Sequence, residues 1–369
     1  MSEDVIETDV LIVGCGLSGL TIADRFAREK DMSVLIVEKR NHIGGNVYDE
    51  IDENGILVSR YGAHLFHTDS ERVWAYVNRF AEWVRWEHKV LAHADGRLVP
   101  VPVNITTINA LCGTSLRSED EARAWLDEHQ ELPVEIRNSE DMALSRVGRR
   151  LYERLFRPYT VKQWGKEPAG LDPSVLARIP VRCSFDDRYF SDRYQALPRH
   201  GYTEFCRSML DHPKIRVLLD TDFFEVRDRI RAGLVFYTGP IDRYFGGLPP
   251  LEYRSLRFET IRLRNVPFFQ PNSVINYPSP DVPYTRIVEY KHFLHQESPH
   301  TTIVRETSTD EGEPFYPVPN PENQALYARY KALADREIGV YFAGRLAGYK
   351  YYNMDQAILA ALELCDRLL

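Results

Sequence analysis

The chain contains 369 residues, enough for about two or three domains and a substantial hydrophobic core. Its formal charge of −8 at pH 7 argues against nucleic acid as the main partner, because no basic block offsets the acidic excess. The five cysteines are scattered without the spacing of a metal site, and no apolar run approaches the roughly 18 residues of a membrane span. The acidic N-terminus lacks the features of a signal peptide, so we expect a cytoplasmic protein. Because the cysteines lack the spacing of a metal site, we expect no bound metal.

The first predicted unit is a buried strand over 9–13, followed by a glycine-rich turn and an amphipathic helix over 17–29. Gly14 allows the tight turn, Gly16 allows a pyrophosphate to approach the backbone, and Gly19 allows the helix to pack against the strand. The diphosphate would lie at the helix N-terminus, where free N–H groups and the helix dipole favour anions. This spacing in this context predicts a dinucleotide-binding site.

A second predicted strand, over 33–37, ends in Glu38, whose carboxylate can hold the ribose of an adenosine. The loop that follows contains Gly44-Gly45 before Asn46, which suggests a second close approach of the backbone to the cofactor. Flavoproteins of the glutathione-reductase-like class resemble this arrangement, and nicotinamide dehydrogenases generally do not. The resemblance favours FAD over NAD, against the alternative of an ordinary surface turn.

Two histidines, His64 and His67, stand three residues apart in a stretch rich in glycine and aromatic residues. Because no third ligand is evident, a metal site is not expected, and structural histidines are the alternative to a functional role. A helix is predicted over 70–80, and a strand-like stretch over 84–103 contains a turn at 94–97.

The chain then becomes almost wholly helical over 106–157, and Pro158 is expected to end the last helix because proline lacks a backbone donor. The stretch 159–165 is crowded with aromatic and cationic residues, which suit a pocket for a base, a sugar and phosphates. A very short helix over 173–180 carries Arg178 and is a candidate mobile lid, the alternative being a solvated arginine.

The second half of the chain returns to the α/β pattern, with a helix predicted over 202–210 and strands over 215–219 and 234–239. Frequent aromatic, β-branched and proline residues over 253–305 predict an antiparallel sheet.

The C-terminal part carries a second cofactor signal. An apolar strand over 340–343 ends at Gly344-Arg345, and a helix is predicted over 354–368. The positive N-terminal end of this helix can stabilise negative charge on a reduced flavin ring. The first and last parts of the chain are therefore expected to form one domain that the middle of the chain interrupts.

Over its whole length the chain closely resembles the bacterial UDP-galactopyranose mutases. The motifs that carry the resemblance are His42-Ile43-Gly44-Gly45-Asn46, Gly62-Ala63-His64-Leu65-Phe66-His67-Thr68, Tyr159-Thr160-Val161-Lys162-Gln163-Trp164-Gly165, Gly344-Arg345-Leu346 and the segment from Tyr349 to Asp355. Generic FAD proteins share the dinucleotide fingerprint but not this set.

The resemblance implies an isomerase that interconverts UDP-galactopyranose and UDP-galactofuranose, with FAD that is active only when reduced. In the family reaction the flavin N5 attacks the anomeric carbon and UDP departs. An iminium adduct then allows ring opening and reclosure before UDP returns. The resemblance also implies UDP-galactose as the substrate, NAD(P)H or another reductant only for reducing FAD, and a homodimer.

By similarity, Arg178 and Arg286 hold the diphosphate from two sides and His67 lies at the flavin face, and these three are the expected catalytic residues. The expected substrate-binding residues are Phe156, Tyr159, Thr160, Trp164, Arg178, Tyr189, Asn276, Arg286, Tyr316, Tyr351 and Asn353. The expected cofactor-binding residues are Gly14, Gly16, Ser18, Gly19, Glu38, Lys39, Gly45, Asn46, His64, Gly344, Arg345, Tyr351 and Met354.

Two positions depart from the family pattern. Asn353 stands where some members have aspartate, which removes a carboxylate near the diphosphate, and Ala63 stands where many have proline, which loosens the backbone beside the sugar. A mutase acting on UDP-N-acetylgalactosamine is therefore an alternative. An FAD-dependent oxidoreductase of the amine-oxidase type and a non-catalytic flavin- or nucleotide-sugar-binding protein are the others.

We therefore expect an α/β fold with a Rossmann-like, glutathione-reductase-like FAD-binding domain, a helical insert and an antiparallel β-sheet substrate domain. The expected boundaries are 1–78, 205–247 and 325–369 for the discontinuous FAD-binding domain, 79–152 for a mostly helical domain, and 153–204 with 248–324 for the substrate domain, which includes a mobile lid at about 173–181.

Overall fold

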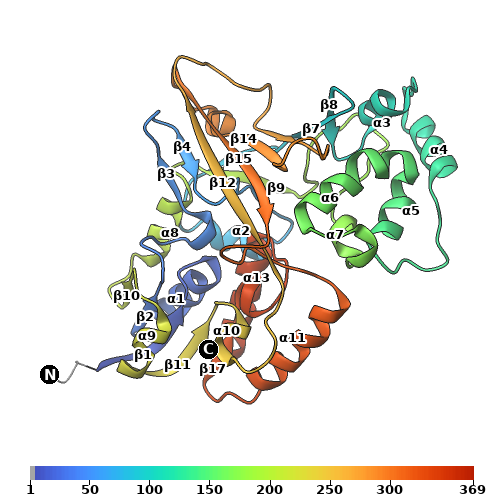
Figure 1. Cartoon of the computed structure of the whole chain (residues 1–369). Helices are drawn as coiled ribbons and strands as arrows, with labels where there is room; N and C mark the ends of the chain where they lie inside the picture. Colours follow the sequence, from blue (N-terminus) through green and yellow to red (C-terminus); the bar gives the residue numbers. More distant parts are fainter. Residues whose placement is uncertain (1–4) are drawn as a thin grey trace.

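A five-stranded parallel sheet forms the base of the molecule in the computed structural model, which describes residues 5–369 (Figure 1). The first four residues of the expected 1–78 segment lie outside the described residues. In order of pairing, the strands are β10 (Ile215–Leu218), β2 (Val34–Val37), β1 (Ile6–Val13), β11 (Ile230–Tyr237) and β17 (Val340–Phe342). They come from three segments that lie far apart in the sequence.

Alternating side chains of β1 supply the cores on the two faces of this sheet. Val10 and Ile12 face α1 (Leu17–Lys30), α8 (Tyr202–Leu210) and α13 (Met354–Leu368), whereas Leu11 and Val13 face α9 (Phe223–Val226) and α12 (Gly344–Ala347). The remaining helices near this sheet are α2 (Glu71–Val77), α10 (Ile241–Phe245) and α11 (Pro321–Ala334). Both faces are covered, as the continuous apolar runs of these strands predict.

A seven-stranded sheet stands above the parallel sheet. Its strands, in order of pairing, are β16 (Tyr316–Pro317), β12 (Tyr253–Leu263), β15 (Thr301–Thr309), β14 (Arg286–Glu289), β13 (Val274–Asn276), β7 (Val90–Ala94) and β8 (Arg97–Val101). All pairs are antiparallel except β13 with β7. Two smaller sheets consist of β3 (Asp49–Ile51) with β4 (Leu57–Ser59), and of β5 (Phe66–Thr68), β9 (Tyr194–Pro198) and β6 (Trp83–Arg85). The predicted combination of a Rossmann-like domain, a helical insert and an antiparallel sheet is confirmed in outline.

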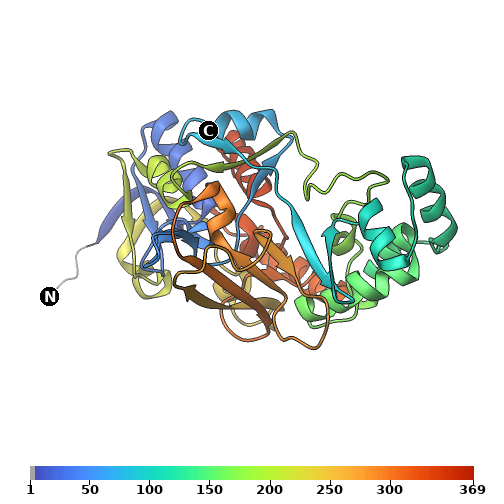
Figure 2. The ribbon, with the colours of Figure 1, turned by 90° about the horizontal axis from the view of Figure 1, so that it is seen from above.

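The helical part lies to one side of both sheets and is reached through the β7–β8 hairpin (Figure 2). Its helices are α3 (Ile105–Cys112), α4 (Glu119–His129), α5 (Ser139–Leu151), α6 (Arg157–Trp164) and α7 (Ser174–Ala177). They share one core with residues of β7, β8 and the 316–318 segment. This continuous core joins the helices to the edge of the large sheet.

The helical stretch does not end at Pro158, contrary to the sequence-based expectation. The π-helical turn Tyr152–Phe156 leads directly into α6, and Pro158 occupies the first turn of that helix. The Arg157 N–H donates to Tyr152 O, five residues earlier. This wider turn accommodates the missing N–H and the bulky ring of proline. The expected pocket residues of 159–165 therefore lie on a helix rather than after one.

The elements also divide the chain differently from the expected boundaries. The segment 79–152, expected to be mostly helical, includes β6, β7 and β8, and two of these strands belong to the large sheet. The helical part instead runs on through α7 into the segment assigned to the substrate sheet. Hydrophobic periodicity cannot reveal that a hairpin pairs with a strand about 180 residues later.

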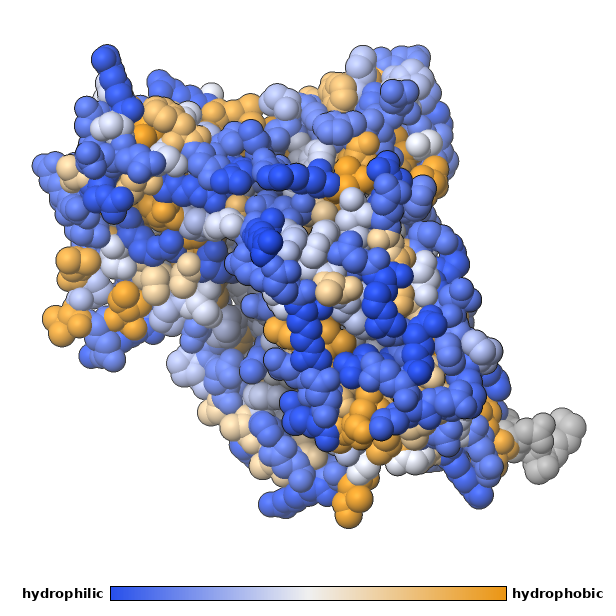
Figure 3. All heavy atoms as spheres, turned by 180° about the vertical axis from the view of Figure 1, so that it is seen from behind, coloured by the Kyte–Doolittle hydropathy of each residue, from blue (hydrophilic) through white to orange (hydrophobic). Residues whose placement is uncertain are grey.

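The face seen from behind is mostly hydrophilic, and hydrophobic side chains form scattered groups on it (Figure 3). A recess opens beneath the lobe at the upper left, which is the helical part. In the described part of the chain, no helix combines the length and apolar character needed to cross a bilayer. The same residues contain no cluster of three side chains suited to hold a metal ion.

A buried carboxylate, Glu289 at the end of β14, organises the neighbouring loop. It accepts hydrogen bonds from the Phe269 and Gln270 N–H groups and from Thr301 Oγ1, at 2.8, 2.9 and 2.6 Å. Burial alone would raise the pKa of Glu289, but its partners, with His292 first among them, outweigh burial and lower the pKa below the ordinary value of 4.5.

We expect Glu289→Gln to lower the free energy of unfolding at pH 7 by about 2–4 kcal/mol, because an amide cannot accept this many bonds. Since the folded pKa is depressed, the carboxylate stabilises the fold fully above pH 4.5 and loses this effect as the pH falls through the folded pKa. Denaturant unfolding at pH 7 and pH 4 should show the difference shrinking in acid. An equal difference at both values would contradict this role.

Candidate active site

Two cavities lie side by side between the parallel sheet, the large sheet and the helical part. One has a volume of about 440 Å³ and the other about 320 Å³. His64, Arg345, Asn353 and Met354 line both cavities. The two cavities are therefore adjacent, and these four residues form the wall that they share.

The smaller cavity begins at the glycine-rich turn between β1 and α1. Gly14 has a φ of +103°, and a Cβ there would lie 2.2 Å from Thr238 Oγ1. A Cβ on Gly19 would lie 2.2 Å from the Gly14 backbone oxygen, so glycine is needed for α1 to approach β1. A Cβ on Gly16 would meet no protein atom within 4 Å. Gly16 therefore borders open space at the N-terminus of a 14-residue helix, whose first turn contains no acidic residue.

The cofactor residues expected from the sequence gather around this space. Those that line the smaller cavity are Gly14, Gly16, Ser18, Gly19, Glu38, Lys39, Gly45, Asn46, His64, Gly344, Arg345 and Met354. Glu38 lies at the end of β2, and its Oε2 accepts a hydrogen bond from the Cys15 N–H at 2.8 Å. The donor set and the open helix N-terminus fit a dinucleotide.

Tyr351, which is expected to contact the cofactor as well as the substrate, lines the larger cavity and not the smaller one, and its contact with the cofactor stays a prediction. The next residue, Tyr352, lines the smaller cavity instead. The two tyrosines are neighbours in a non-helical segment, so their side chains face different cavities.

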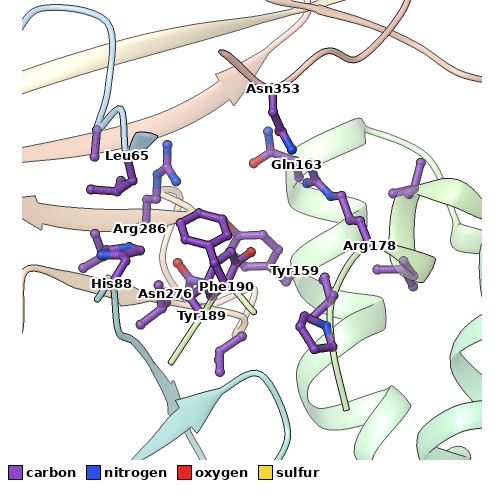
Figure 4. A pocket seen from close by; sticks show the side chains of 18 of the residues that line it. Leu65, His88, Tyr159, Gln163, Arg178, Tyr189, Phe190, Asn276, Arg286 and Asn353 are labelled. Carbon is purple, nitrogen blue, oxygen red and sulfur yellow. The ribbon is translucent and has the colours of Figure 1, made fainter. Parts of the chain in front are cut away.

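The larger cavity lies between α6 and α7 on one side and the large sheet on the other. Every residue expected to bind substrate lines it: Phe156, Tyr159, Thr160, Trp164, Arg178, Tyr189, Asn276, Arg286, Tyr316, Tyr351 and Asn353. Arg178 and Arg286 lie on opposite sides, with Tyr189 and Phe190 between them (Figure 4). Their roles remain predictions, but the fold gathers them in one place.

Register across the large sheet positions Arg286. Asn276 on β13 and Glu306 on β15 are its direct partners on the two neighbouring strands. Arg286 Nε lies 2.6 Å from Glu306 Oε2, and the Glu306 side chain is only 1% exposed. Burial alone would lower the pKa of Arg286, but the adjacent carboxylate outweighs burial and raises it, so the guanidinium stays charged. A buried carboxylate thus fixes a cation at the cavity wall.

The opposite side of the cavity places two more cations beside aromatic rings. The Arg178 guanidinium lies 4.4 Å from the ring centroid of Tyr351, and that of Arg345 lies 5.3 Å from the same centroid. Burial alone would raise the pKa of Tyr351, but these cations outweigh burial and lower it. Three guanidinium groups therefore surround a space that suits a doubly charged diphosphate.

The three imidazoles of the cavity differ in their partners. Burial, reinforced by nearby arginines, lowers the pKa of His64 to about 4, and burial lowers the pKa of His88 to about 3. His64 Nδ1 lies 2.8 Å from Gly62 O, which favours an Nδ1–H donor and leaves Nε2 as an acceptor. His67, on β5, pairs instead with Asp192: its Nδ1 lies 3.1 Å from Asp192 Oδ2.

Sequence reasoning missed several residues of the site. Gln163, His88, Phe190 and Asp192 line the cavity, and Glu306 holds Arg286 from behind. Gln163 stands inside a motif that was recognised, and the helical spacing of α6 would have placed it near Tyr159. Strand register and loop packing bring the other four residues to the site, and neither leaves a local signal in the sequence.

Comparisons with known proteins agree with this geometry. The family model described as UDP-galactopyranose mutase matches residues 154–351, and one described as NAD(P)-binding Rossmann-like domain matches residues 12–80. A "Probable UDP-galactopyranose mutase" of Klebsiella pneumoniae is 40% identical, with 98% of this chain and 94% of the relative covered. A "dTDP-fucopyranose mutase" of Escherichia coli is 39% identical, with 97% of each covered. A crystal structure of reduced UDP-galactopyranose mutase superposes with a TM-score of 0.77 at 15% identity, covering 98% of this chain and 93% of that one. The chain belongs to the UDP-galactopyranose mutase family and is an isomerase.

Proposed function

We propose that the protein interconverts UDP-galactopyranose and UDP-galactofuranose with the help of reduced FAD. The observation that carries the proposal is the shared wall of the two cavities, which places a space ringed by three guanidinium groups against a dinucleotide site. A nucleotide sugar held by its diphosphate would present its anomeric carbon at that wall. When bound there, reduced FAD would supply a nucleophilic ring nitrogen that holds the sugar while UDP is detached.

In this proposal the side chains of the chain bind and orient the substrate. Arg178 and Arg286 grip the diphosphate from opposite sides, stabilise the leaving UDP and keep it close for recombination. Tyr159 and Trp164 on α6 line the nucleoside side of the cavity. His64, with its depressed pKa, stays neutral at the shared wall and adds no positive charge there.

The segment 173–180 is proposed to act as a lid that brings Arg178 over the diphosphate. It is anchored at both ends: the Asp172 N–H donates to Pro319 O at 2.9 Å, and the Arg182 N–H donates to Val103 O at 2.9 Å. Between these anchors, α7 is a single turn. Val175 and Leu176 pack in the helical core, and Arg146 of α5 donates to the Leu176 and Ala177 backbone oxygens, so a tilt of the lid must break these contacts or move α5 with it.

The proposed activity is tested by incubating the purified protein, with FAD, with UDP-galactofuranose, once oxidised and once reduced by dithionite. Sugar-nucleotide chromatography should show UDP-galactopyranose only in the reduced sample, because the oxidised ring lacks the nucleophilic nitrogen. Conversion in both samples would contradict the role of reduced FAD.

The same assay separates the alternatives. Because a relative of nearly equal identity is named for a dTDP sugar, parallel samples contain dTDP-fucofuranose and UDP-N-acetylgalactosamine. Faster turnover of either would reassign the substrate within the same cavity. Stoichiometric flavin reduction by an amine would instead indicate an oxidoreductase, and UDP binding without turnover in any sample would indicate a binding protein.

A further inference from the structure

The two walls of the dinucleotide cavity touch each other through three charged side chains. Lys39 and Arg40 directly follow β2 of the parallel sheet, whereas Glu313 belongs to the loop between β15 and β16 of the large sheet. All three side chains line the cavity of about 320 Å³, and none of them lines the larger cavity. We call this group the Glu313 clasp. It belongs to the proposed cofactor site and not to the proposed substrate site.

Each carboxylate oxygen of Glu313 holds one cation. Lys39 Nζ lies 2.7 Å from Glu313 Oε1. Arg40 Nη2 and Nε lie 2.5 and 3.2 Å from Glu313 Oε2. Burial alone would raise the pKa of Glu313, but the two cations outweigh burial and lower it, so the carboxylate is charged at neutral pH. At these distances no ligand can pass between the two walls while the clasp is closed.

The clasp lies beside the residue predicted to hold the adenosine ribose. That residue is Glu38, which precedes Lys39 and lines the same cavity. Glu38 Oε1 accepts a hydrogen bond from the Arg40 N–H at 2.9 Å, so the cationic side of the clasp is fixed relative to Glu38. With FAD as the cofactor, which rests on the proposed function, the clasp closes the adenosine end of the cavity.

Two of the three side chains are free to move. The side chains of Lys39 and Glu313 are each 44% exposed, so both can turn into solvent. The Arg40 side chain is only 15% exposed. It donates to Asn46 Oδ1 at 3.0 Å, and its guanidinium lies 4.2 Å from the centroid of the Tyr61 ring. The clasp therefore joins two mobile side chains to one that is held in place.

The backbone that carries Glu313 is anchored to β12. The Glu313 backbone oxygen accepts a hydrogen bond from Ser255 Oγ at 2.7 Å. The Phe315 N–H donates to Arg254 O at 2.9 Å, and the Arg254 guanidinium pairs with Asp310. Because the loop is held on both sides of Glu313, the clasp opens by rotation of side chains and leaves both sheets in place.

We propose that the Glu313 clasp is a gate through which FAD enters and leaves its cavity. The ion pairs of the clasp join protein atoms only, so they form in the cofactor-free protein and in the loaded protein alike. An interaction that is equally strong in both states does not change the affinity, but it slows entry and exit by the same factor. A gate therefore differs from a binding contact, whose loss speeds only exit.

The test measures the exchange of FAD and does not depend on turnover. Protein loaded with isotope-labelled FAD is mixed with excess unlabelled FAD, and the label that stays on the protein gives the dissociation rate. Stopped-flow flavin fluorescence with the cofactor-free protein gives the association rate. Glu313→Gln should raise both rates by about tenfold, because a neutral amide holds neither cation by charge, and the dissociation constant should change by less than about threefold. In about 1 M NaCl the two proteins should differ by less than about threefold, because salt screens exposed ion pairs.

Glu311→Gln is the matched control. Glu311 lies two residues before Glu313 in the same loop, is exposed, and does not line the cavity. Its replacement removes the same charge from the same loop and should change neither rate. The control thus separates loss of the clasp from loss of a negative charge near an anionic cofactor.

Unchanged association and dissociation rates in Glu313→Gln would overturn the proposal, since FAD would then pass elsewhere. Faster dissociation with an unchanged association rate would also overturn it, because Glu313 would then support binding and would not act as a gate. A protein that binds no FAD would refute both this proposal and the proposed function. The expected exchange rates in a protein that forms no furanose when reduced would refute the proposed function alone.

Discussion

Replacing Arg286 by alanine should lower kcat/KM for UDP-galactofuranose by about 1000-fold, because a charge-assisted contact to the leaving diphosphate is lost at the step where charge develops. The same change strands Glu306, whose buried carboxylate then lacks the guanidinium that lies 2.6 Å away. An uncompensated buried charge should lower the free energy of unfolding by about 3–5 kcal/mol. Steady-state kinetics of the reduced protein and denaturant unfolding measure the two effects.

A double variant separates the catalytic loss from the structural one. Arg286→Ala with Glu306→Gln removes the stranded charge, so most of the stability should return while the kinetic loss persists. Arg305→Ala is the matched control, since Arg305 lies on β15, pairs with the exposed Glu259 and does not line the cavity. Arg286 would be a structural residue only if activity returned together with stability in the double variant.

Gly16→Ala and Gly19→Ala should fail in different ways although the two glycines belong to one turn. A Cβ on Gly16 points into open space, so the fold should tolerate it, but that space is where a diphosphate would lie. We expect FAD affinity to fall about 100-fold, equivalent to losing roughly 2–3 kcal/mol of backbone contacts to an anion. The melting temperature of the cofactor-free protein should change little.

Gly19→Ala places its Cβ 2.2 Å from a backbone oxygen, and backbone cannot rotate away as a side chain can. We therefore expect the cofactor-free Gly19→Ala protein to melt at a clearly lower temperature, because α1 must move off β1. Flavin fluorescence titration and thermal unfolding of both variants form the comparison. Equal melting temperatures in the two variants would show that the close approach of α1 and β1 is not required.

Local signals in the sequence determined much of the site. Glycine spacing, strand–helix alternation and the boundaries of α8 and α13 were predictable because each depends on a few adjacent residues. The contacts that tune the site were not predictable from the sequence. Glu306 reaches Arg286 through strand register, and Asp192 reaches His67 across 125 residues of chain, so only the folded structure reveals these partners.

Pro158 shows a different limit. A proline after a long helical pattern normally marks its end, yet the π-helical turn before it allows the chain to continue as α6. The prediction was wrong because the rule considers the proline alone. The backbone before Pro158 forms a π-helical turn and continues as a helix, and this helix places Tyr159 and Gln163 at the cavity.

The split origin of the parallel sheet has a consequence for biosynthesis. Strand β17 and helices α12 and α13 are the last three elements in chain order, yet β17 completes the sheet and the start of α13 forms part of the wall between the cavities. While the ribosome is still making this last segment, the earlier strands expose an edge and the dinucleotide site lacks one side. We therefore expect strands β1, β2, β10 and β11 to lack their last partner strand until synthesis is nearly finished. The complete flavin site can form only after α13 has emerged from the ribosome.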